Sequence, residues 1–590
     1  MQNADTMLTV IRSRGERELH LERVYRSLFN PELYLLAYAN LYSNQGALTK
    51  GITEETVDGM SLAKINSLIE EIKSERFRWT PVRRTYIPKT NGRSRPLGIP
   101  TWRDKLMQEV IRLILESYFE PQFEDASHGF RPERGCHTAL TIVQRTWKGT
   151  RWFVEGDIKG CFDNIDHTVL LNILRRKIHD GRFIALIEGL LKAGYLEDWK
   201  FNRTFSGTPQ GGVVSPILAN IYLTELDRFV NKELIPEFTK GIKRESNKHY
   251  ERLRSRSKKA KARGDLDAAR EWAVLSRQQP SQNPTDPNYR RLRYVRYADD
   301  FLLGFIGTRA EAEAIKRRVK TWLTENLKLE LSEEKTLITH ATEDRAKFLG
   351  YEIGIMKSES RPSVNGAIEL RIPEAKLLEI ENRYKRGSKA HHRAELVNDS
   401  DFDIVAKYGA EFRGLVQFYK LARNIRRLGK AERTIRLSLL KTLANKLRTT
   451  VKDVWMRYKY RHTNIDLGTR MGLRVTVQRG DKSTLVAKFG ETPLKRRQNA
   501  AIRDEKPAWT RRVKRTELIQ RLLADECELC GHEGVDVHHV RALKDLKSTG
   551  RKSVPTHVFV MSARKRKTLV VCKKCHHAIH NGLPTRTKLT

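Results

Sequence analysis

Three aspartates carry the residue types and spacing that metal-dependent phosphoryl transfer needs. Asp299 and Asp300 stand side by side between two apolar, β-favouring runs, which predicts a hairpin with acid at its tip. Asp157 follows another apolar run earlier in the chain. Carboxylate oxygens that converge from rigid strands suit Mg²⁺, and two such ions can hold the attacking and leaving oxygens of a phosphate. The other interpretation of these residues is a solvated acidic hairpin without an ion.

A basic hairpin is predicted N-terminal to these aspartates. Residues 83–100 contain an Asn-Gly dipeptide between two short basic runs, which is a strong signal for a tight β-turn. Lys89 and Arg95 flank this turn, where their charges could grip the triphosphate of an incoming nucleotide and offset charge on the leaving group. A solvated basic hairpin without a ligand is the alternative.

Four of the six cysteines form two Cys-x-x-Cys pairs near the C-terminus. Cys527 and Cys530 make the first pair, and Cys572 and Cys575 make the second. This spacing predicts a closed tetrahedral Zn²⁺ site that folds a small domain with little core of its own. Six cysteines in the whole chain exclude a disulfide scaffold, so we expect a reducing compartment.

The composition indicates a polyanionic partner. Lys and Arg number 112 against 71 Asp and Glu, which gives a net charge of +41. Nucleic acid is favoured over a membrane surface because the sequence has no long apolar span and no lipidation motif. The first 22 residues lack the apolar core of a signal peptide, so we expect the protein to stay where it is made.

The surrounding elements are predicted from periodicity and capping signals. Helical spacing occupies 21–80 and 310–329, and a helix is expected to begin at Thr101. Asp166 is expected to cap the helix that follows it, and Ser215 to cap another, with Pro216 in its first turn. A chain of 590 residues is too long for one core, so about three to five modules are expected.

The segment 240–293 holds 16 Lys or Arg against 6 Asp or Glu. Phosphate contacts dominate affinity for nucleic acid, and the segment leads directly into the acidic hairpin, so an RNA-facing insertion is favoured. A solvated helical insertion is the alternative. Farther on, 408–422 and 439–447 are basic and helical, with aromatic residues that either stack on unpaired RNA bases or pack between helices.

Several blocks together resemble the reverse transcriptases encoded by mobile group II introns, over about Leu33 to His580. The palm signature is Tyr297-Ala-Asp-Asp300, and it is joined by 157–163, 208–217 and the thumb-like blocks 408–422 and 439–447. The resemblance implies that Asp157, Asp299 and Asp300 bind Mg²⁺ for polymerisation.

The same resemblance implies roles for residues around the palm. Phe162 stands where an aromatic ring excludes a ribose 2′-hydroxyl, and Arg131 is a candidate contact to template phosphate. Gln210 and Gly211 are expected to contact template or nucleotide. Lys335 is expected near the departing pyrophosphate, where it could act as a general acid.

The C-terminal histidines resemble an HNH endonuclease. By this resemblance His539 is the general base that activates water, and His538, His576 and His580 hold a single divalent ion, Mg²⁺ or similar, or the scissile phosphate. No asparagine lies between the two histidine clusters, so another group must orient the base. A zinc module that only binds DNA is the alternative.

These interpretations predict a multidomain α+β chain: a right-hand polymerase with fingers, palm and helical thumb, followed by a zinc-stapled ββα nuclease. The expected divisions are a helical extension of the fingers (1–80), reverse transcriptase fingers and palm (81–365), thumb or maturase domain (366–460), a basic, poorly periodic DNA-binding linker (461–520) and the nuclease (521–590).

The function expected for this architecture combines RNA-directed DNA polymerase, splicing factor and DNA endonuclease activities. The expected partners are an intron RNA, target DNA and dNTPs, without a membrane. The protein is expected in the cytoplasm of a bacterium, associated with the nucleoid, or in an organelle. Rivals are a non-enzymatic RNA-folding factor, which predicts damaged catalytic positions, and the reverse transcriptase of a defence or diversity-generating system, which needs neither the thumb blocks nor the nuclease.

Overall fold

Two apolar cores organise the chain. The computed structural model describes all residues except 1–2, 45, 89–91, 93, 198–199, 203–210, 284–285, 359–363, 465–467, 480–481, 498–516, 542–554, 565 and 586–590. One core joins the N-terminal helices, one face of the central sheet and the C-terminal module; the other joins the opposite sheet face to the thumb. Among the described residues, no helix is both long and apolar enough to cross a membrane.

The N-terminal region is helical, as its spacing predicted. It contains α1 (Ala4–Glu16), α2 (Pro31–Leu41) and α3 (Leu62–Lys73). The side chain of Asn30 caps α2 by accepting from the backbone N–H of Glu32, and Pro31 occupies the first turn, where no N–H partner is needed. Between α2 and α3, residues 42–61 run without a long element and reach toward the C-terminal module.

The predicted basic hairpin is present. Strands β2 (Val82–Pro88) and β3 (Ser94–Ile99) pair in register from Arg83 with Ile99 to Pro88 with Ser94. Its Asn-Gly turn lies largely outside the described residues. Thr101 caps the following helix α4 (Trp102–Phe119), as expected. The hairpin belongs to a four-stranded sheet completed by β6 (Tyr195–Glu197) and β7 (Lys200–Asn202).

The palm sheet is antiparallel, in the order β10-β4-β9-β8. Its strands are β4 (Trp152–Asp157), β8 (Arg291–Tyr297), β9 (Asp300–Ile306) and β10 (Ile338–His340). Alternation along β8 and β9 divides them between the cores: Tyr294 and Leu303 enter the first core, whereas Val295 and Leu302 enter the second. The helices of the fingers and palm are α5 (Cys136–Thr146), α6 (His167–Arg175), α7 (Gly181–Lys192), α8 (Ser215–Phe229), α9 (Ile235–Glu237) and α12 (Arg309–Leu327).

The capping predictions in this region are largely confirmed. Asp166 accepts from the backbone N–H of Val169 at the start of α6. Helix α8, however, begins at Ser215 with Val214 as its cap, so the expected cap lies one residue too late. A short parallel pair, β1 (Leu21–Glu22) with β5 (Ile178–His179), ties the N-terminal region to α6 and α7.

The thumb combines helices with a sheet that the sequence interpretation missed. A three-stranded sheet of β11 (Ala346–Phe348), β12 (Tyr351–Ile355) and β13 (Ile368–Arg371) leads from the palm into the thumb. The thumb continues with α13 (Glu374–Asn382), β14 (Lys385–Arg386), β15 (Lys389–Ala390), α14 (Asp401–Phe418), α15 (Leu428–Leu447) and α16 (Val451–Tyr458). A three-stranded antiparallel sheet follows: β16 (Lys459–Asn464), β17 (Gly468–Arg479) and β18 (Lys482–Phe489).

The prediction that 461–520 is a poorly periodic linker is therefore wrong for its first part. Leu473 and Val475 on β17 and Ala487 and Phe489 on β18 alternate with exposed polar residues and are buried in the thumb core. This period of two is visible in the sequence once strands are sought. The DNA-binding role of 461–520 remains a prediction.

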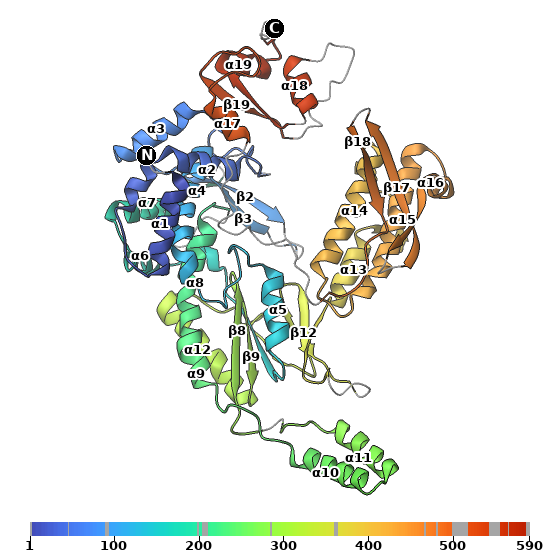
Figure 1. Cartoon of the computed structure of the whole chain (residues 1–590). Helices are drawn as coiled ribbons and strands as arrows, with labels where there is room; N and C mark the ends of the chain where they lie inside the picture. Colours follow the sequence, from blue (N-terminus) through green and yellow to red (C-terminus); the bar gives the residue numbers. More distant parts are fainter. Residues whose placement is uncertain are drawn as a thin grey trace.

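The basic insertion forms a helical hairpin, α10 (Lys248–Ala262) and α11 (Leu266–Gln278), which projects away from the palm in Figure 1. The C-terminal module contains α17 (Glu517–Leu523), β19 (Val535–His539), α18 (Thr556–Arg564), β20 (Thr568–Cys572) and α19 (Lys573–His580). The antiparallel pair β19–β20 followed by α19 has the predicted ββα order. Figure 1 shows this module beside α2 and α3.

Candidate active sites

The three palm aspartates lie at the ends of paired strands. Asp157 ends β4 and is the register partner of Asp300, the first residue of β9. Asp300 also pairs with Tyr297 of β8, so Ala298 and Asp299 form the hairpin turn. Ala298 adopts a φ of 55°, the left-handed conformation that tight hairpin turns favour. Backbone pairing therefore brings Asp157 and Asp300, 143 positions apart, to one edge of the sheet.

Burial and mutual repulsion make these carboxylates suited to a cation. Burial, followed by the charges of Asp299 and Asp157, raises the pKa of Asp300 to about 6. Burial also raises the pKa of Asp299, and the charge of Asp157 adds to the shift. A divalent cation would relieve this repulsion, and a set of carboxylate oxygens fits Mg²⁺.

Two predicted cations act on this acidic site. Lys335 donates from Nζ to Asp157 Oδ2 at 2.9 Å, with most of its side chain still in solvent. Arg95 on β3 is exposed, and its charge opposes the rise in the pKa of Asp299, so the fingers hairpin lies within electrostatic reach of the palm. Lys89 and Gln210 lie outside the described residues.

A buried ion pair that the sequence interpretation missed supports the acidic hairpin. Arg296 on β8 is fully buried and binds Asp227 of α8 through two hydrogen bonds of 2.7 and 2.6 Å. Its guanidinium also donates to the carbonyl of Ala298 at 2.8 Å, next to Asp299. The available signal was a cation at an apolar-face position of β8. Arg296 thus ties the carboxylate turn to a core helix.

The loop at 126–131 packs against the same turn, which corrects one prediction. A Cβ on Gly129 would lie 2.3 Å from the backbone nitrogen of Ala298, so only glycine permits this approach. Arg131, predicted to contact template phosphate, is buried; it pairs with Glu120 at 3.0 Å and donates to the carbonyls of Glu124 and Ser127. Its guanidinium holds the loop rather than facing a template.

Phe162 and Gly211 were both predicted to contact nucleotide or template, and their neighbours within the protein are Phe130 and Leu97. Phe162 occupies a 3₁₀ turn just after Asp157, half-buried, with its ring 6.4 Å edge-on from that of Phe130. Gly211 has a φ of 104°, and a Cβ there would lie 2.7 Å from Leu97 of the fingers hairpin. The glycine thus allows the backbone at position 211 to approach β3.

The four cysteines converge, as their spacing predicted. All four Sγ atoms lie within 4.8 Å of one another, and Cys530 is 3.6 Å from both Cys572 and Cys575. None of the four forms a disulfide. Thiolates about 2.3 Å from a central ion would stand a little under 4 Å apart, so the set fits a tetrahedral Zn²⁺.

The nuclease histidines also converge, together with a residue that the sequence interpretation missed. Ligand atoms of His538, His576 and His580 lie within 4.8 Å of one another and of Asp58, which precedes α3. Burial lowers the pKa of His538 to about 4, whereas hydrogen bonds to Asp536 and Asp58 raise the pKa of His576 to about 9, so an ion bound here would displace the proton of His576. His557 lies beside His538, with ring centroids 6.3 Å apart.

His539 is buried, and its Nε2 lies 2.8 Å from the hydroxyl of Tyr38 on α2. Burial lowers its pKa to about 4. It also lines a cavity of about 660 Å³ between the C-terminal module and the segment after α2. The cations around this cavity are Arg521, Arg541, Arg566 and Lys567. The tyrosine hydroxyl is thus the hydrogen-bond partner of the expected base.

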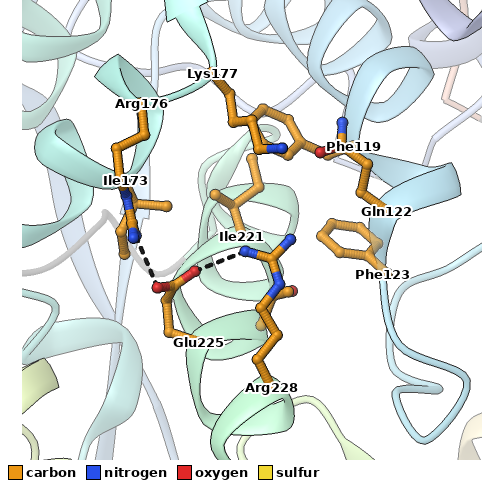
Figure 2. Close-up of a pocket in the computed structure, with 10 residues that line it drawn as sticks. Phe119, Gln122, Phe123, Ile173, Arg176, Lys177, Ile221, Glu225 and Arg228 are labelled. Atoms are coloured by element: carbon orange, nitrogen blue, oxygen red, sulfur yellow. Dashed lines mark hydrogen bonds and ion pairs between the residues drawn. The ribbon is translucent and has the colours of Figure 1, made fainter. Parts of the chain in front are cut away.

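A smaller pocket, of about 80 Å³, lies between α4, α6 and α8 (Figure 2). Its cations already have partners: Arg176 and Arg228 both pair with Glu225, and Lys177 pairs with Glu18. Because its charges are satisfied within the protein, we assign this pocket to packing.

Three family models match successive parts of the chain. A reverse transcriptase (RNA-dependent DNA polymerase) model matches 87–353, a type II intron maturase model matches 374–498, and an AI2M/AI1M-like HNH endonuclease model matches 527–576. The maturase match extends over the sheet β16–β18, in agreement with its packing on the thumb helices.

Two of its relatives match nearly the whole length of this chain, and a third matches a shorter part. Group II intron-encoded protein LtrA of Lactococcus lactis subsp. cremoris is 40% identical over 95% of this chain and 96% of its own. An uncharacterized 91 kDa protein in a cob intron of Schizosaccharomyces pombe is 33% identical over 96% of this chain and 71% of its own. An uncharacterized mitochondrial protein of Marchantia polymorpha, ymf11, is 38% identical over 40% of this chain and 30% of its own. The chain therefore belongs to the group II intron-encoded proteins, with reverse transcriptase, maturase and HNH endonuclease domains.

Proposed function

We propose that this protein binds its parent intron RNA, promotes its splicing, nicks a DNA target and copies the RNA from the nick. The observation that carries the polymerase part is the carboxylate edge, where Asp157 and Asp300 are register partners and Asp299 forms the turn. The set is complete, which disfavours a non-enzymatic RNA-folding factor.

In the polymerase site, the protein's own residues hold and orient the reactants. Asp157, Asp299 and Asp300 would hold Mg²⁺, which would supply Lewis-acid chemistry and neutralise charge at the triphosphate. Lys335, beside Asp157, provides a proton or a positive charge to the departing pyrophosphate, and Arg95 contacts the triphosphate from the fingers. Phe162 excludes a 2′-hydroxyl and so favours dNTPs.

In the nuclease site, neutral His539 accepts a proton from the attacking water. His538, His576 and His580 would hold one divalent ion, which would neutralise charge on the scissile phosphate. Cleavage that leaves a 3′-hydroxyl on the nicked strand provides the primer that the palm site needs. The cations around the adjacent cavity support contact with DNA phosphates.

The paired substrate that tests this proposal is one DNA target, either intact or already nicked. His539→Ala should eliminate nicking and copying at the intact target, yet leave extension from the pre-nicked target unchanged. If His539→Ala copied RNA into the intact target at the parent's rate, the nuclease assignment would be wrong. The module would then be a zinc domain that only binds DNA, and the primer would come from another source.

Splicing assistance is assigned to phosphate neutralisation by the fingers and thumb, independent of ion chemistry. Arg423 supports this assignment: it is half-exposed on the thumb, although it lies 3.5 Å from Glu369. Reversing the charge of Lys420 and Arg423 should weaken splicing of the parent intron several-fold. Asp299→Ala should splice normally; if it lost splicing as completely as polymerisation while folded, the two activities would share a site.

The proposed setting is a ribonucleoprotein with the intron RNA, at the nucleoid of a bacterial cell or inside an organelle. A bacterial relative and a mitochondrial one support these two hosts. Sequencing RNA that copurifies with the protein tests the partner directly, because a parent intron should dominate the recovered sequences.

A further inference from the structure

The nuclease module is joined to the fingers through β19, the strand that carries His538 and His539. Met60 and Val537 form an antiparallel bridge, in which Gly59 N–H donates to Val537 C=O and Val537 N–H donates to Met60 C=O, both at 2.9 Å. The segment 57–60 thus occupies the edge of the β19–β20 pair. Helix α17 packs on α2, and its Leu518 and Leu522 belong to the core of the N-terminal helices.

This docking inserts Asp58 among the three histidines. Its Oδ2 lies 2.8 Å from His580 Nε2 and 3.3 Å from His576 Nε2, and its Oδ1 lies 3.5 Å from His538 Nδ1. The two helix histidines are 3.1 Å apart at Nε2. Ligands about 2.0–2.1 Å from a tetrahedral ion would stand roughly 3.4 Å apart, so these four groups have ion-binding spacing.

One histidine atom indicates independently that a ligand belongs here. His538 is 6% exposed, and its Nδ1 forms no hydrogen bond with any described residue. A buried nitrogen without a hydrogen bond is costly unless an ion takes its lone pair. A metal-free ion pair between Asp58 and His576 is the competing explanation, and it leaves this nitrogen unsatisfied.

The docking also covers the base. Tyr38 is fully buried, and its hydroxyl meets the Nε2 of His539. Asp58 fixes the same residue from its other side by accepting from the His539 backbone N–H at 2.7 Å. A base that must take a proton from water is held here by two residues of the fingers.

We propose that Asp58 is the fourth ligand of the nuclease ion and that it keeps the nuclease closed while the module is docked on the fingers. Catalytic ion sites keep one position open for water or substrate, whereas four protein ligands close a tetrahedral site. A scissile phosphate offers the same anionic oxygen chemistry as Asp58. Target DNA, drawn in by the cations of the adjacent cavity, therefore opens the site by replacing the carboxylate. This inference rests on the proposed nuclease function.

The first experiment measures coordination, independent of cleavage. Co²⁺ is titrated into the full-length protein with zinc already in the cysteine site, and its visible absorption is recorded. Three histidines and one carboxylate in a tetrahedron absorb strongly, whereas the carboxylate site of the palm gives weak bands. Asp58→Ala should weaken the strong bands and lower Co²⁺ affinity about tenfold. The matched control, Glu55→Ala, removes an exposed carboxylate from the same segment and should change neither quantity.

The second experiment measures nicking of an intact DNA target by the same proteins with Mg²⁺. Asp58→Ala should nick about tenfold faster than the parent at saturating Mg²⁺, because a larger fraction of the protein is open. Tyr38→Phe, which keeps the ring packing and frees His539, should also be faster. Unchanged Co²⁺ bands in Asp58→Ala would show that Asp58 is no ligand; nicking that fell or stayed equal would show that docking does not close the site.

One double variant separates this inference from the proposed function. Asp58→Ala combined with His539→Ala should lose the gained nicking while keeping the Co²⁺ spectrum of Asp58→Ala. If the gained nicking survived, His539 would not be the base, although closure by Asp58 would stand.

Discussion

The palm and nuclease sites assemble carboxylates and imidazoles by opposite means. In the palm, Asp157 and Asp300 are neighbours in one sheet, and a fully buried ion pair behind them fixes the turn. In the nuclease, a contact between the C-terminal module and the N-terminal region brings Asp58 within 2.8 Å of His580, 522 positions apart. A site built into a core keeps its geometry without a ligand, whereas a site built at a contact depends on what holds the contact. We therefore expect substitutions to affect the folding and activity of the palm site and of the nuclease site independently.

Cys527→Ser should produce the largest loss of folding free energy, and this loss should be confined to the nuclease module. Zinc contributes on the order of 10 kcal/mol to folding small Cys₄ domains, so its loss should unfold the module. Limited proteolysis should then cut within 517–585, while extension of a supplied primer persists. A module that stays resistant to protease without zinc would show that packing on α2 alone holds it.

Asp299→Ala tests the palm half. Primer extension on an RNA template should fall by roughly a thousandfold, because one ion ligand is lost, while RNA binding remains with the many exposed cations. Nicking by the nuclease should be unaffected, which serves as the internal control. Extension at the parent's rate with the same Mg²⁺ would refute the assignment of the palm site.

Arg296→Met asks whether the palm turn depends on the buried ion pair. Removing the cation leaves Asp227 buried without its main partner, which should lower the free energy of unfolding of the palm by about 3 kcal/mol. Adding Asp227→Leu should recover a large part of that loss, since no unpaired charge remains. Denaturant unfolding followed by palm-specific proteolysis measures both. Equal stability of the single variant and the parent would mean that the pair does not anchor the turn.

Asp300→Asn should give the smallest change in the free energy of unfolding, and in the opposite direction: without metal, the variant should be more stable than the parent. Because the pKa of Asp300 is raised to about 6 in the fold, the folded state binds its proton more tightly than the unfolded state does. That stability is complete below pH ~4 and is lost as pH rises to about 6. Asparagine should remove this loss and add roughly 1–2 kcal/mol at pH 7, although extension is abolished.

The measurement for this last variant is thermal unfolding in chelator at pH 4.5 and pH 7. The parent should lose more stability than Asp300→Asn between these two values, and saturating Mg²⁺ should reduce the difference. If the parent and Asp300→Asn lost equal stability between the two pH values, the ionised Asp300 carboxylate would not destabilise the metal-free palm.

The contrast between the two sites also explains what the sequence could predict. Apolar runs on both sides of Asp299 and after Trp152 specify strands, and strand pairing then brings the aspartates together. The spacing of the cysteines likewise predicted the zinc site. Asp58 and Tyr38 lie in segments without a chemical motif, and only tertiary docking gives them partners.

Two further differences have the same physical origin. Arg131 matched a family motif, yet its guanidinium forms an ion pair with Glu120 inside the protein. A motif does not show whether a cation binds a ligand or another side chain. The strands β17 and β18 were missed because the solvent-facing positions carry many charged residues, so the composition resembles a basic linker until Leu473 and Phe489 are counted on one face.

The packing of α17 on α2 has a consequence for proteins that lose the nuclease. A chain shortened before residue 517 would uncover the apolar surface of α2 that Leu518 and Leu522 now cover. Newly exposed apolar surface favours self-association. Descendants without the module should therefore accumulate polar substitutions along that face of α2, and laboratory truncations should need the same substitutions to remain monomeric.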